Sequence, residues 1–236
     1  MSKTNKKNRR NSKPKTDQRP IEQFAPCQIY LITPPRIDDI SAFAKSLDSV
    51  LAAAPVACLQ IRLKDTARDD IIKAAEILIP IAHKYGTDVL INDDPQIALK
   101  TGADGVHLGQ SDMDINLAKN MLGADAIIGV TCHNSKELAF SACSGGASYV
   151  AFGAVYESAT KPGAVRADLE IFTWWQEAIE IPSVAIGGIN PSNAQAVIEA
   201  GADFIALSSG VWDWSAGPMD AVTRLHQLCL QPSALA

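Results

Sequence analysis

The repetition of one short apolar run followed by a helix-length interval is the feature that most constrains the fold of this chain. The runs are rich in β-branched residues, and the longer intervals carry apolar residues at the three- and four-residue spacing of helices. The predicted strands are residues 28–33, 56–62, 88–92, 105–108, 126–131, 149–153, 183–187 and 204–208. The clearest predicted helices are residues 37–53 and 68–85, and one or two helical turns at 95–101 and a final amphipathic segment at 218–230 are also predicted. Because strands and helices alternate throughout, the pattern predicts an α/β fold with a parallel sheet.

Three joints between these units share a local sequence pattern. In segments 101–106, 145–150 and 200–205, a helix ends near a glycine and small residues lead directly into the next strand. Glycine adopts the left-handed conformation that closes a helix without steric cost. Eight such units close most economically into a single (β/α)8 TIM barrel, which we predict for residues 25–236. A doubly wound open sheet is the alternative, but it usually has a glycine-rich turn after its first strand, where residues 33–36 read Thr-Pro-Pro-Arg.

The amino-terminal residues 1–24 are predicted to form a disordered basic tail. The first 20 residues contain eight Lys or Arg residues, one acid and no apolar residue after Met1, so they cannot bury enough surface to fold. The rest of the chain has 13 bases and 25 acids. A body this acidic is a poor binder of nucleic acid, and the tail is the one weak exception to that expectation.

The cysteines and the hydropathy pattern favour a cytoplasmic protein. Five cysteines are scattered along the chain, mostly within apolar runs, which indicates reduced thiols rather than a disulfide framework. No stretch approaches the roughly 20 apolar residues of a membrane span. Cys132 and His133 are adjacent, and neighbours on a strand point to opposite faces, so we do not expect them to form a catalytic dyad.

Two aspartates follow neighbouring predicted strands at the point where each strand ends. Asp93 comes after residues 88–92, and Asp112 comes shortly after residues 105–108. Parallel neighbours place their carboxyl ends on one side of a sheet, so the two carboxylates are predicted to converge. Mg²⁺ binds one or two carboxylates and leaves its other positions to water and phosphate. The alternative is that both acids cap the helices that follow.

Cationic and polar side chains also gather at the predicted strand ends. Gln60, Arg62 and Lys64 alternate along the second strand and so point in one direction, towards the barrel mouth. Two cations in such a place need an anion, because an unpaired buried charge is costly. The alternative is that these cations form ion pairs with Asp93 or Asp112.

The loops after the sixth, seventh and eighth strands carry further candidates for ligand binding. The long segment 153–163 contains two hydroxyls and a lysine and is a candidate lid. The segments 187–191 and 207–210 are rich in glycine and serine. Loops after strands seven and eight commonly bind phosphate in this fold, because glycines let backbone N–H groups approach the anion.

Seven motifs in order give the chain a resemblance to the thiamine phosphate synthase (thiamine-phosphate pyrophosphorylase) and thiazole tautomerase superfamily, across residues 27–230. The motifs are Tyr30-Leu31-Ile32-Thr33, Gln60-Ile61-Arg62-Leu63-Lys64, Ile91-Asn92-Asp93, residues 102–110 with Asp112, Gly129-Val130-Thr131-Cys132-His133, Ser158-Ala159-Thr160-Lys161 and Ala185-Ile186-Gly187-Gly188-Ile189. The resemblance implies a transferase that condenses hydroxymethylpyrimidine diphosphate with hydroxyethylthiazole phosphate. The products would be thiamine phosphate and diphosphate, formed through a pyrimidine cation.

The resemblance also implies a role for each matched residue. Asp93 and Asp112 are the implied ligands of the Mg²⁺ cofactor. Arg62, Lys64 and Lys161 are the implied catalytic cations. The implied contacts to the pyrimidine diphosphate are Gln60, Arg62, Lys64, Asn92, Thr131 and Lys161. The implied thiazole phosphate site consists of Ser158, Thr160, Gly188, Ser208 and Ser209. The partners expected are small phosphorylated molecules, and a homo-oligomer is an open possibility.

Some positions depart from the family pattern. Leu63 replaces a frequent glutamate, Ala159 replaces a proline, and Asp94 replaces an arginine next to the diphosphate site. We expect Asp94 to cap the following helix and point away from the site. Two alternatives stay open from the sequence. One is a thiazole tautomerase, with His133 as its proton-transfer residue, and the other is a diverged, non-catalytic phosphate-binding barrel.

Overall fold

The protein is a closed barrel of eight parallel strands, which confirms the predicted (β/α)8 fold. The computed structural model describes residues 26–157 and 166–231, so the predicted tail at 1–24 lies outside the described residues. The strands are β1 (Gln28–Ile32), β2 (Cys58–Ile61), β3 (Asp88–Asn92), β4 (Gly105–Leu108), β5 (Ile127–His133), β6 (Tyr149–Gly153), β7 (Ser183–Ile186) and β8 (Phe204–Leu207). Each strand pairs with the next, and β8 closes the barrel by pairing with β1.

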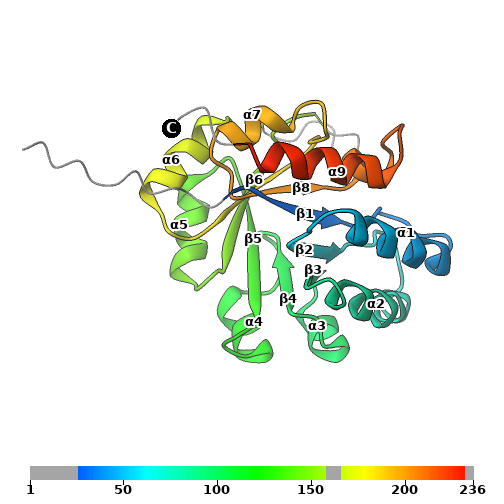
Figure 1. Cartoon of the computed structure of the whole chain (residues 1–236). Helices are drawn as coiled ribbons and strands as arrows, with labels where there is room; N and C mark the ends of the chain where they lie inside the picture. The colour runs from blue at the N-terminus through cyan, green and yellow to red at the C-terminus, as the bar shows by residue number, and fades with distance from the viewer. Residues whose placement is uncertain (1–25, 158–165, 232–236) are drawn as a thin grey trace, which may run out of the picture.

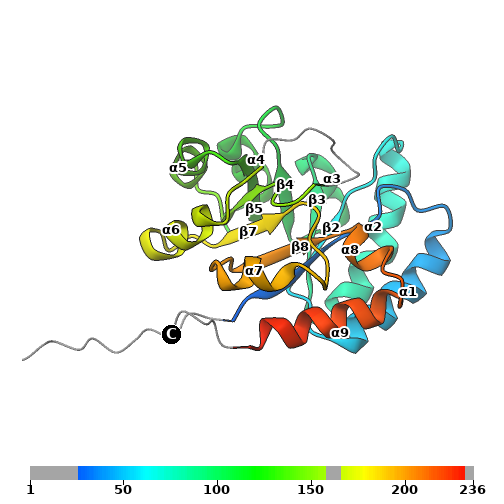
Figure 2. The ribbon, with the colours of Figure 1, turned by 90° about the horizontal axis from the view of Figure 1, so that it is seen from above.

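Helices surround the strands on the outside, as Figures 1 and 2 show. They are α1 (Ile40–Ala53), α2 (Arg68–His83), α3 (Pro95–Thr101), α4 (Ile115–Leu122), α5 (Lys136–Ser144), α6 (Glu170–Ala178), α7 (Ala194–Glu199), α8 (Ser209–Trp212) and α9 (Pro218–Cys229). None of the helices in the described ranges combines the length and hydrophobicity needed to cross a membrane.

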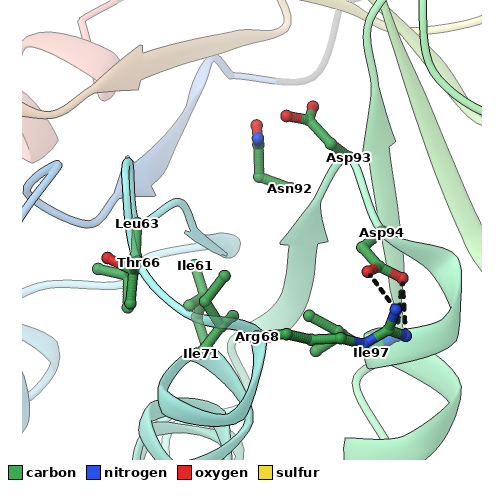
Figure 3. Close-up of a pocket in the computed structure, with 9 residues that line it drawn as sticks. All are labelled: Ile61, Leu63, Thr66, Arg68, Ile71, Asn92, Asp93, Asp94 and Ile97. Atoms are coloured by element: carbon green, nitrogen blue, oxygen red, sulfur yellow. Dashed lines mark hydrogen bonds and ion pairs between the residues drawn. The ribbon is translucent and has the colours of Figure 1, made fainter.

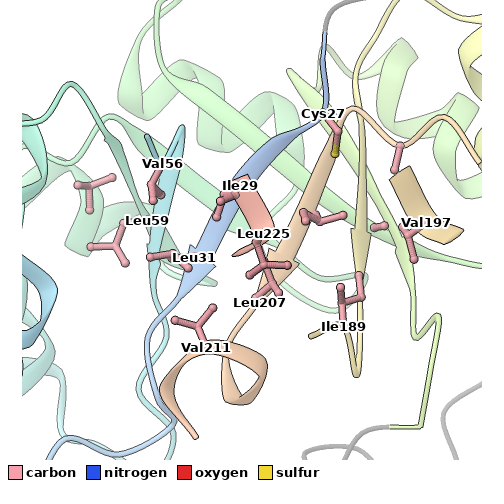
Figure 4. Packing of buried hydrophobic residues seen from close by; sticks show 14 of the residues in the cluster. Cys27, Ile29, Leu31, Val56, Leu59, Ile189, Val197, Leu207, Val211 and Leu225 are labelled. Carbon is pink, nitrogen blue, oxygen red and sulfur yellow. The ribbon is translucent and has the colours of Figure 1, made fainter. Parts of the chain in front are cut away.

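Side chains on one face of a strand pack against the surrounding helices, and those on the other face point into the barrel interior. Ile29 and Leu31 of β1 belong to the larger core cluster, which includes helix residues such as Leu225 of α9. Figure 4 shows this layer between the strands and the surrounding helices. Tyr30 and Ile32 belong instead to a cluster that contains strand residues alone and therefore fills the barrel interior. The period of two along the strand thus separates the outer core from the interior.

Short-range signals explain where several elements begin and end. α1 begins at Ile40 rather than at the predicted 37, because the carboxylate of Asp39 accepts hydrogen bonds from two N–H groups of its first turn. At the repeated joints, Gly102, Gly146 and Gly201 all have positive φ angles. Each glycine leads from a helix into the next strand in the way that the repeated sequence pattern predicted.

Long-range contacts move other boundaries. Arg62 lies beyond β2, because its backbone N–H donates to the Thr33 hydroxyl at 2.9 Å and not to a neighbouring strand's backbone. β5 extends to His133, past the predicted end at 131, through a shift of register between Thr131 and His133. The helix α8 was not predicted, because four residues are too few to show a helical period.

Candidate active site

The carboxylates of Asp93 and Asp112 meet at the carboxyl end of the barrel. Asp93 directly follows β3, and its backbone N–H donates to the carbonyl of His107 in β4 at 2.8 Å. Asp112 lies in the loop after β4, where its carboxylate accepts a hydrogen bond of 2.7 Å from the Gly109 N–H. The two carboxylates lie close enough for Asp112 to raise the pKa of Asp93. The convergence that the sequence predicted for these two acids is therefore present in the structure.

This proximity makes Asp93 hard to ionise. Although the residue as a whole is exposed, the surrounding strand ends desolvate its carboxylate, and the neighbouring Asp112 adds repulsion. Together these effects raise the pKa of Asp93 to about 6, against the opposing attraction of Arg62. A divalent cation between the two carboxylates would remove this repulsion. Two converging carboxylates of this kind could hold a divalent cation.

The capping alternative applies to the neighbouring acids and not to this pair. Asp94 is the N-cap of α3, where its carboxylate accepts hydrogen bonds from the N–H groups of Gln96 and Ile97. Asp114 is the N-cap of α4 in the same way. Since each helix already has its cap, Asp93 and Asp112 do not perform that function.

The departure from the family pattern at position 94 has a structural explanation. Asp94 points away from Asp93 and forms an ion pair with Arg68 at 3.3 Å, as Figure 3 shows. Its predicted role as a cap is confirmed. Asp94 and Leu63 both line a cavity of about 240 Å³ between α2 and α3, at whose mouth Asn92 and Asp93 lie. The added negative charge is therefore neutralised on the outer side of the strand ends.

Arg62 and Lys64 form no ion pair with any carboxylate in residues 26–157 or 166–231. Arg62 is half-buried just beyond β2, and this burial lowers its pKa while the nearby Asp93 raises it. The alternative of direct ion pairs with Asp93 or Asp112 is therefore wrong for the described residues. The guanidinium is held at the barrel mouth within the field of the acid pair.

Polar side chains form one hydrogen-bonded chain through the barrel interior. The Gln60 amide donates to the Tyr30 hydroxyl at 2.8 Å, and the hydroxyls of Tyr30 and Tyr149 lie 2.9 Å apart. The Tyr149 hydroxyl lies 2.7 Å from Nδ1 of His107, whose Nε2 lies 2.8 Å from the Thr131 hydroxyl. Gln60 and Thr131, both predicted site residues, are thus connected across the barrel.

The three residues in the middle of this hydrogen-bonded chain were not predicted as site residues. Tyr30, His107 and Tyr149 lie in strands β1, β4 and β6 and are buried in the interior. Their signal in the sequence is that each is a polar or phenolic residue inside an apolar strand. Position alone does not show which way such a side chain points.

The loops after β7 and β8 meet beside a second cavity of about 300 Å³. Gly188, Ser209 and Gly210 line it, together with Glu157 at the end of the described part of the β6 loop. Gly188 has a φ of +64° and lies so close to the backbone carbonyl of Glu157 that a side chain would clash. The two loops are therefore in the predicted arrangement.

The other residues predicted for the thiazole phosphate site lie in different surroundings. Ser208 donates its hydroxyl proton to the Thr33 carbonyl at 3.0 Å, and Ser209 is exposed in the first turn of α8. Ser158, Thr160 and Lys161 lie outside the described residues.

Cys132 and His133 point to opposite sides, which confirms that they form no dyad. Cys132 is fully buried in the outer core, and burial raises the pKa of its thiol to about 12. His133 is exposed and has a φ of +53°.

Comparisons with known proteins give a consistent family relationship. The sequence model of the family described as thiamine monophosphate synthase matches residues 29–211. The thiamine-phosphate synthase of Rhodospirillum centenum is 48% identical over 202 residues, which cover 86% of this chain and 97% of the relative. That of Hyphomonas neptunium is 48% identical over 207 residues, covering 85% and 93%.

Solved structures extend the relationship to three dimensions. A thiamine phosphate pyrophosphorylase from Pyrococcus furiosus superimposes with a TM-score of 0.76 at 30% identity, covering 86% of this chain and 95% of that one. A 3-hexulose-6-phosphate synthase superimposes with a TM-score of 0.60 at 20% identity, and at that identity the likeness shows the barrel fold alone.

Proposed function

The chain belongs to the thiamine monophosphate synthase family, and from that premise we propose that it is a transferase that joins two phosphorylated precursors. The substrates are hydroxymethylpyrimidine diphosphate and hydroxyethylthiazole phosphate, and the products are thiamine phosphate and diphosphate. The bond between the pyrimidine methylene and the diphosphate breaks, and its electron pair leaves with the diphosphate. The thiazole nitrogen then uses its lone pair to form the new C–N bond to the pyrimidine cation.

We propose that Asp93 and Asp112 hold a Mg²⁺ ion for this reaction. Their carboxylates converge from adjacent strands, and the raised pKa of Asp93 records a repulsion that a cation relieves. No cluster of three or more His, Cys, Asp or Glu residues that could hold a metal exists within the described ranges. Two carboxylates suit Mg²⁺, which keeps its other positions for water and substrate phosphate. When bound, Mg²⁺ supplies positive charge that offsets the charge of the departing diphosphate.

The cations at the mouth provide the rest of this charge. Arg62 lies just past β2 within electrostatic reach of Asp93, and Lys64 follows two residues later. Neither has a carboxylate partner among the described residues. Negative charge grows on the diphosphate as its bond breaks, so fixed cations there stabilise the transition state more than the substrate. Lys161 belongs to the same proposed set, although it lies outside the described residues. No nucleophilic side chain or general base is needed for this path.

The neutral polar residues orient the two rings. Gln60, Asn92 and Thr131 contact the pyrimidine in this proposal, and they come from β2, β3 and β5 around the mouth. The thiazole phosphate is assigned to Gly188, Ser208 and Ser209, with Ser158 and Thr160 from the β6 loop. The cavity supports that assignment by its place at the loops after β7 and β8, which commonly bind phosphate in this fold. It is lined by Gly188 and Ser209 and also by the acids Glu157 and Asp213.

The observation that carries the proposal is the acid pair beside unpaired cations at the carboxyl end of a barrel of this family. It is tested by mixing the purified protein with both precursors and Mg²⁺ and measuring thiamine phosphate and diphosphate. Both products should form in equal amounts, and chelation of the metal should stop their formation. Absence of thiamine phosphate with both precursors saturating would refute the proposed function.

The proposed setting is the cytoplasm, with small phosphorylated molecules as the only partners that the site requires. All five cysteines are unpaired, which fits a reducing compartment.

A further inference from the structure

The hydrogen-bonded chain in the barrel interior links two of the proposed pyrimidine contacts. It runs from Gln60 in β2 through Tyr30, Tyr149 and His107 to Thr131 in β5. Its four bonds have heavy-atom distances between 2.7 and 2.9 Å. The two ends come from strands on different sides of the barrel, so neither end can turn without disturbing the other.

The chemistry of the members gives this chain one direction. The Gln60 amide nitrogen donates to Tyr30, so the arrangement that gives both phenol protons an acceptor within this chain directs the Tyr30 proton to Tyr149 and the Tyr149 proton to Nδ1 of His107. An imidazole that accepts at Nδ1 carries its proton on Nε2 and donates it to the Thr131 oxygen. The Gln60 carbonyl oxygen is then left to accept a hydrogen bond, and the Thr131 hydroxyl is left to donate one.

Burial makes this direction difficult to change. Gln60 and Tyr30 are each 2% exposed, His107 is 6% exposed and Tyr149 is 7% exposed. Water therefore cannot replace a missing partner at low cost, and each broken link leaves a buried polar group unsatisfied. Burial also raises the pKa of both phenols, so the two tyrosines remain protonated and keep their donor role.

We propose that Tyr149 and His107 are positioning residues, which fix the hydrogen-bond polarity that Gln60 and Thr131 offer to the pyrimidine ring. This inference rests on the proposed function for the identity of the ring. A 4-aminopyrimidine presents an amino donor beside ring-nitrogen acceptors, which matches one accepting and one donating group held in fixed places. Among the described residues, this chain ends at Gln60 and Thr131 and includes neither Arg62 nor Lys64. It therefore acts on recognition of the ring and not on binding of the diphosphate.

The test separates these two parts of the substrate with the variant Tyr149→Phe. This change keeps the aromatic ring and its packing but removes the hydroxyl that joins Tyr30 to His107. One probe is the pyrimidine diphosphate, with binding measured by calorimetry in the presence of Mg²⁺. The other is inorganic diphosphate, which occupies the anion site without any ring.

We expect Tyr149→Phe to bind the pyrimidine diphosphate about tenfold more weakly, because the change breaks the link between Gln60 and Thr131 at its centre. Its affinity for inorganic diphosphate and its KM for the thiazole phosphate should match those of the wild-type protein. Tyr30→Phe should weaken pyrimidine binding in the same direction, since it removes the hydrogen-bond partner of the Gln60 amide and also breaks the link to Tyr149. It also serves as the test if Tyr149→Phe does not fold.

The matched control is Tyr85→Phe, which removes a tyrosine hydroxyl bonded to Asp48 on the outer surface. It should change neither affinity. Wild-type affinity for the pyrimidine in both interior variants would overturn the inference, as would an equal loss for inorganic diphosphate. Wild-type protein that binds the pyrimidine diphosphate but forms no product would refute the proposed function alone, because the binding measurement needs no turnover.

Discussion

At the amino end of the barrel, polar side chains just before β4, β6 and β8 accept hydrogen bonds from the backbone of the preceding strand. At the carboxyl end, by contrast, two acids face each other. Asp104 accepts from the Val89 N–H at 2.7 Å, and Ser148 accepts from the Ile128 N–H at 3.1 Å. Asp203 follows the same pattern with the Ser183 N–H at 2.8 Å. The three residues occupy equivalent places in the repeated joints, so one local pattern joins neighbouring strands three times.

At the carboxyl end, the charged side chains of the described residues are not paired in this way. Asp93 and Asp112 repel each other, and Arg62 has no carboxylate partner among the described residues. Backbone strain is concentrated there too. Among the described residues, the non-glycine positions with positive φ are Asp65, Asp93 and His133, and each lies at or just past the end of a strand at this end of the barrel.

The comparison teaches that this barrel divides stability and function between its two ends. At the amino end, Asp104, Ser148 and Asp203 each have a partner within the chain and contribute to folding. At the carboxyl end, the groups are held in arrangements that cost stability and are completed by ligands. The following predictions test that division, in order of decreasing effect.

Loss of either acid at the carboxyl end should have the largest effect on catalysis. Asp93→Asn and Asp112→Asn keep the shape of the side chain but remove its charge. We expect kcat/KM to fall at least about 100-fold, on the order of 3 kcal/mol of transition-state stabilisation, with the fold unchanged. Steady-state kinetics across a range of Mg²⁺ concentrations would measure it. Asp114→Asn is the matched control, because Asp114 is the N-cap of α4 and asparagine also caps helices. Near wild-type rates in both acid variants would remove the metal assignment.

Loss of an acid at the amino end should affect stability instead. Asp203→Ala removes the acceptor for both the N–H and the hydroxyl of Ser183, which is fully buried. We expect the free energy of unfolding to fall by about 1–3 kcal/mol with kcat/KM unchanged. Urea denaturation followed by circular dichroism would measure the loss. Asp203→Asn keeps an acceptor oxygen and should lose less. A change in kcat/KM at full folding would contradict the division between the ends.

Removing the charge of Asp93 should stabilise the protein without metal. A carboxyl group whose folded pKa of about 6 lies above its unfolded value of 3.8 destabilises the folded state once it is ionised, so its cost grows as pH rises. With a chelator at pH 8, Asp93→Asn should raise the free energy of unfolding by about 1 kcal/mol, a value reduced for solvent screening at this exposed residue. The gain should shrink as pH falls through about 6. A variant less stable than the wild type at pH 8 would show that the ionised Asp93 carboxylate does not destabilise the folded state.

The smallest effect should come from the ion pair between Arg68 and Asp94, on the outer side of the same strand ends. Asp94→Asn keeps the helix cap and loses the pair, and should cost less than about 1 kcal/mol of stability, mostly in low salt. Asp94→Ala also loses the cap of α3 and should cost about 1 kcal/mol more. Thermal denaturation at two salt concentrations separates the contributions. Equal stabilities for the two variants would mean that the cap contributes nothing.

Much of the architecture could be predicted because its signals are local. The strand at 88–92, the helix at 95–101 and the strand at 105–108 were predicted with the bounds that the structure has. Their sequence also placed Asp93 and Asp112 on one side of the sheet, since a short crossover makes two strands parallel neighbours. Glycines marked the joints before β4, β6 and β8 for the same kind of local reason.

Contacts between distant residues could not be predicted in the same way. Nothing in Asp112-Met113-Asp114 shows which acid caps a helix and which faces the mouth, because that depends on the turn that the backbone takes. The chain through Tyr30, Tyr149 and His107 joins strands separated by up to 119 residues. It forms only when the barrel closes.

The sequence by itself determined the alternation of strands and helices, the closure of eight units and the side of the barrel where charged residues gather. These follow from periodicity and capping, which act over a few residues. The tertiary structure alone decided that Asp93 and Asp112 lie close enough to interact, that Arg62 lacks a carboxylate partner among the described residues and that Gln60 is tied to Thr131. Such features depend on distances across the closed barrel, and a change of register by one residue would alter every one of them.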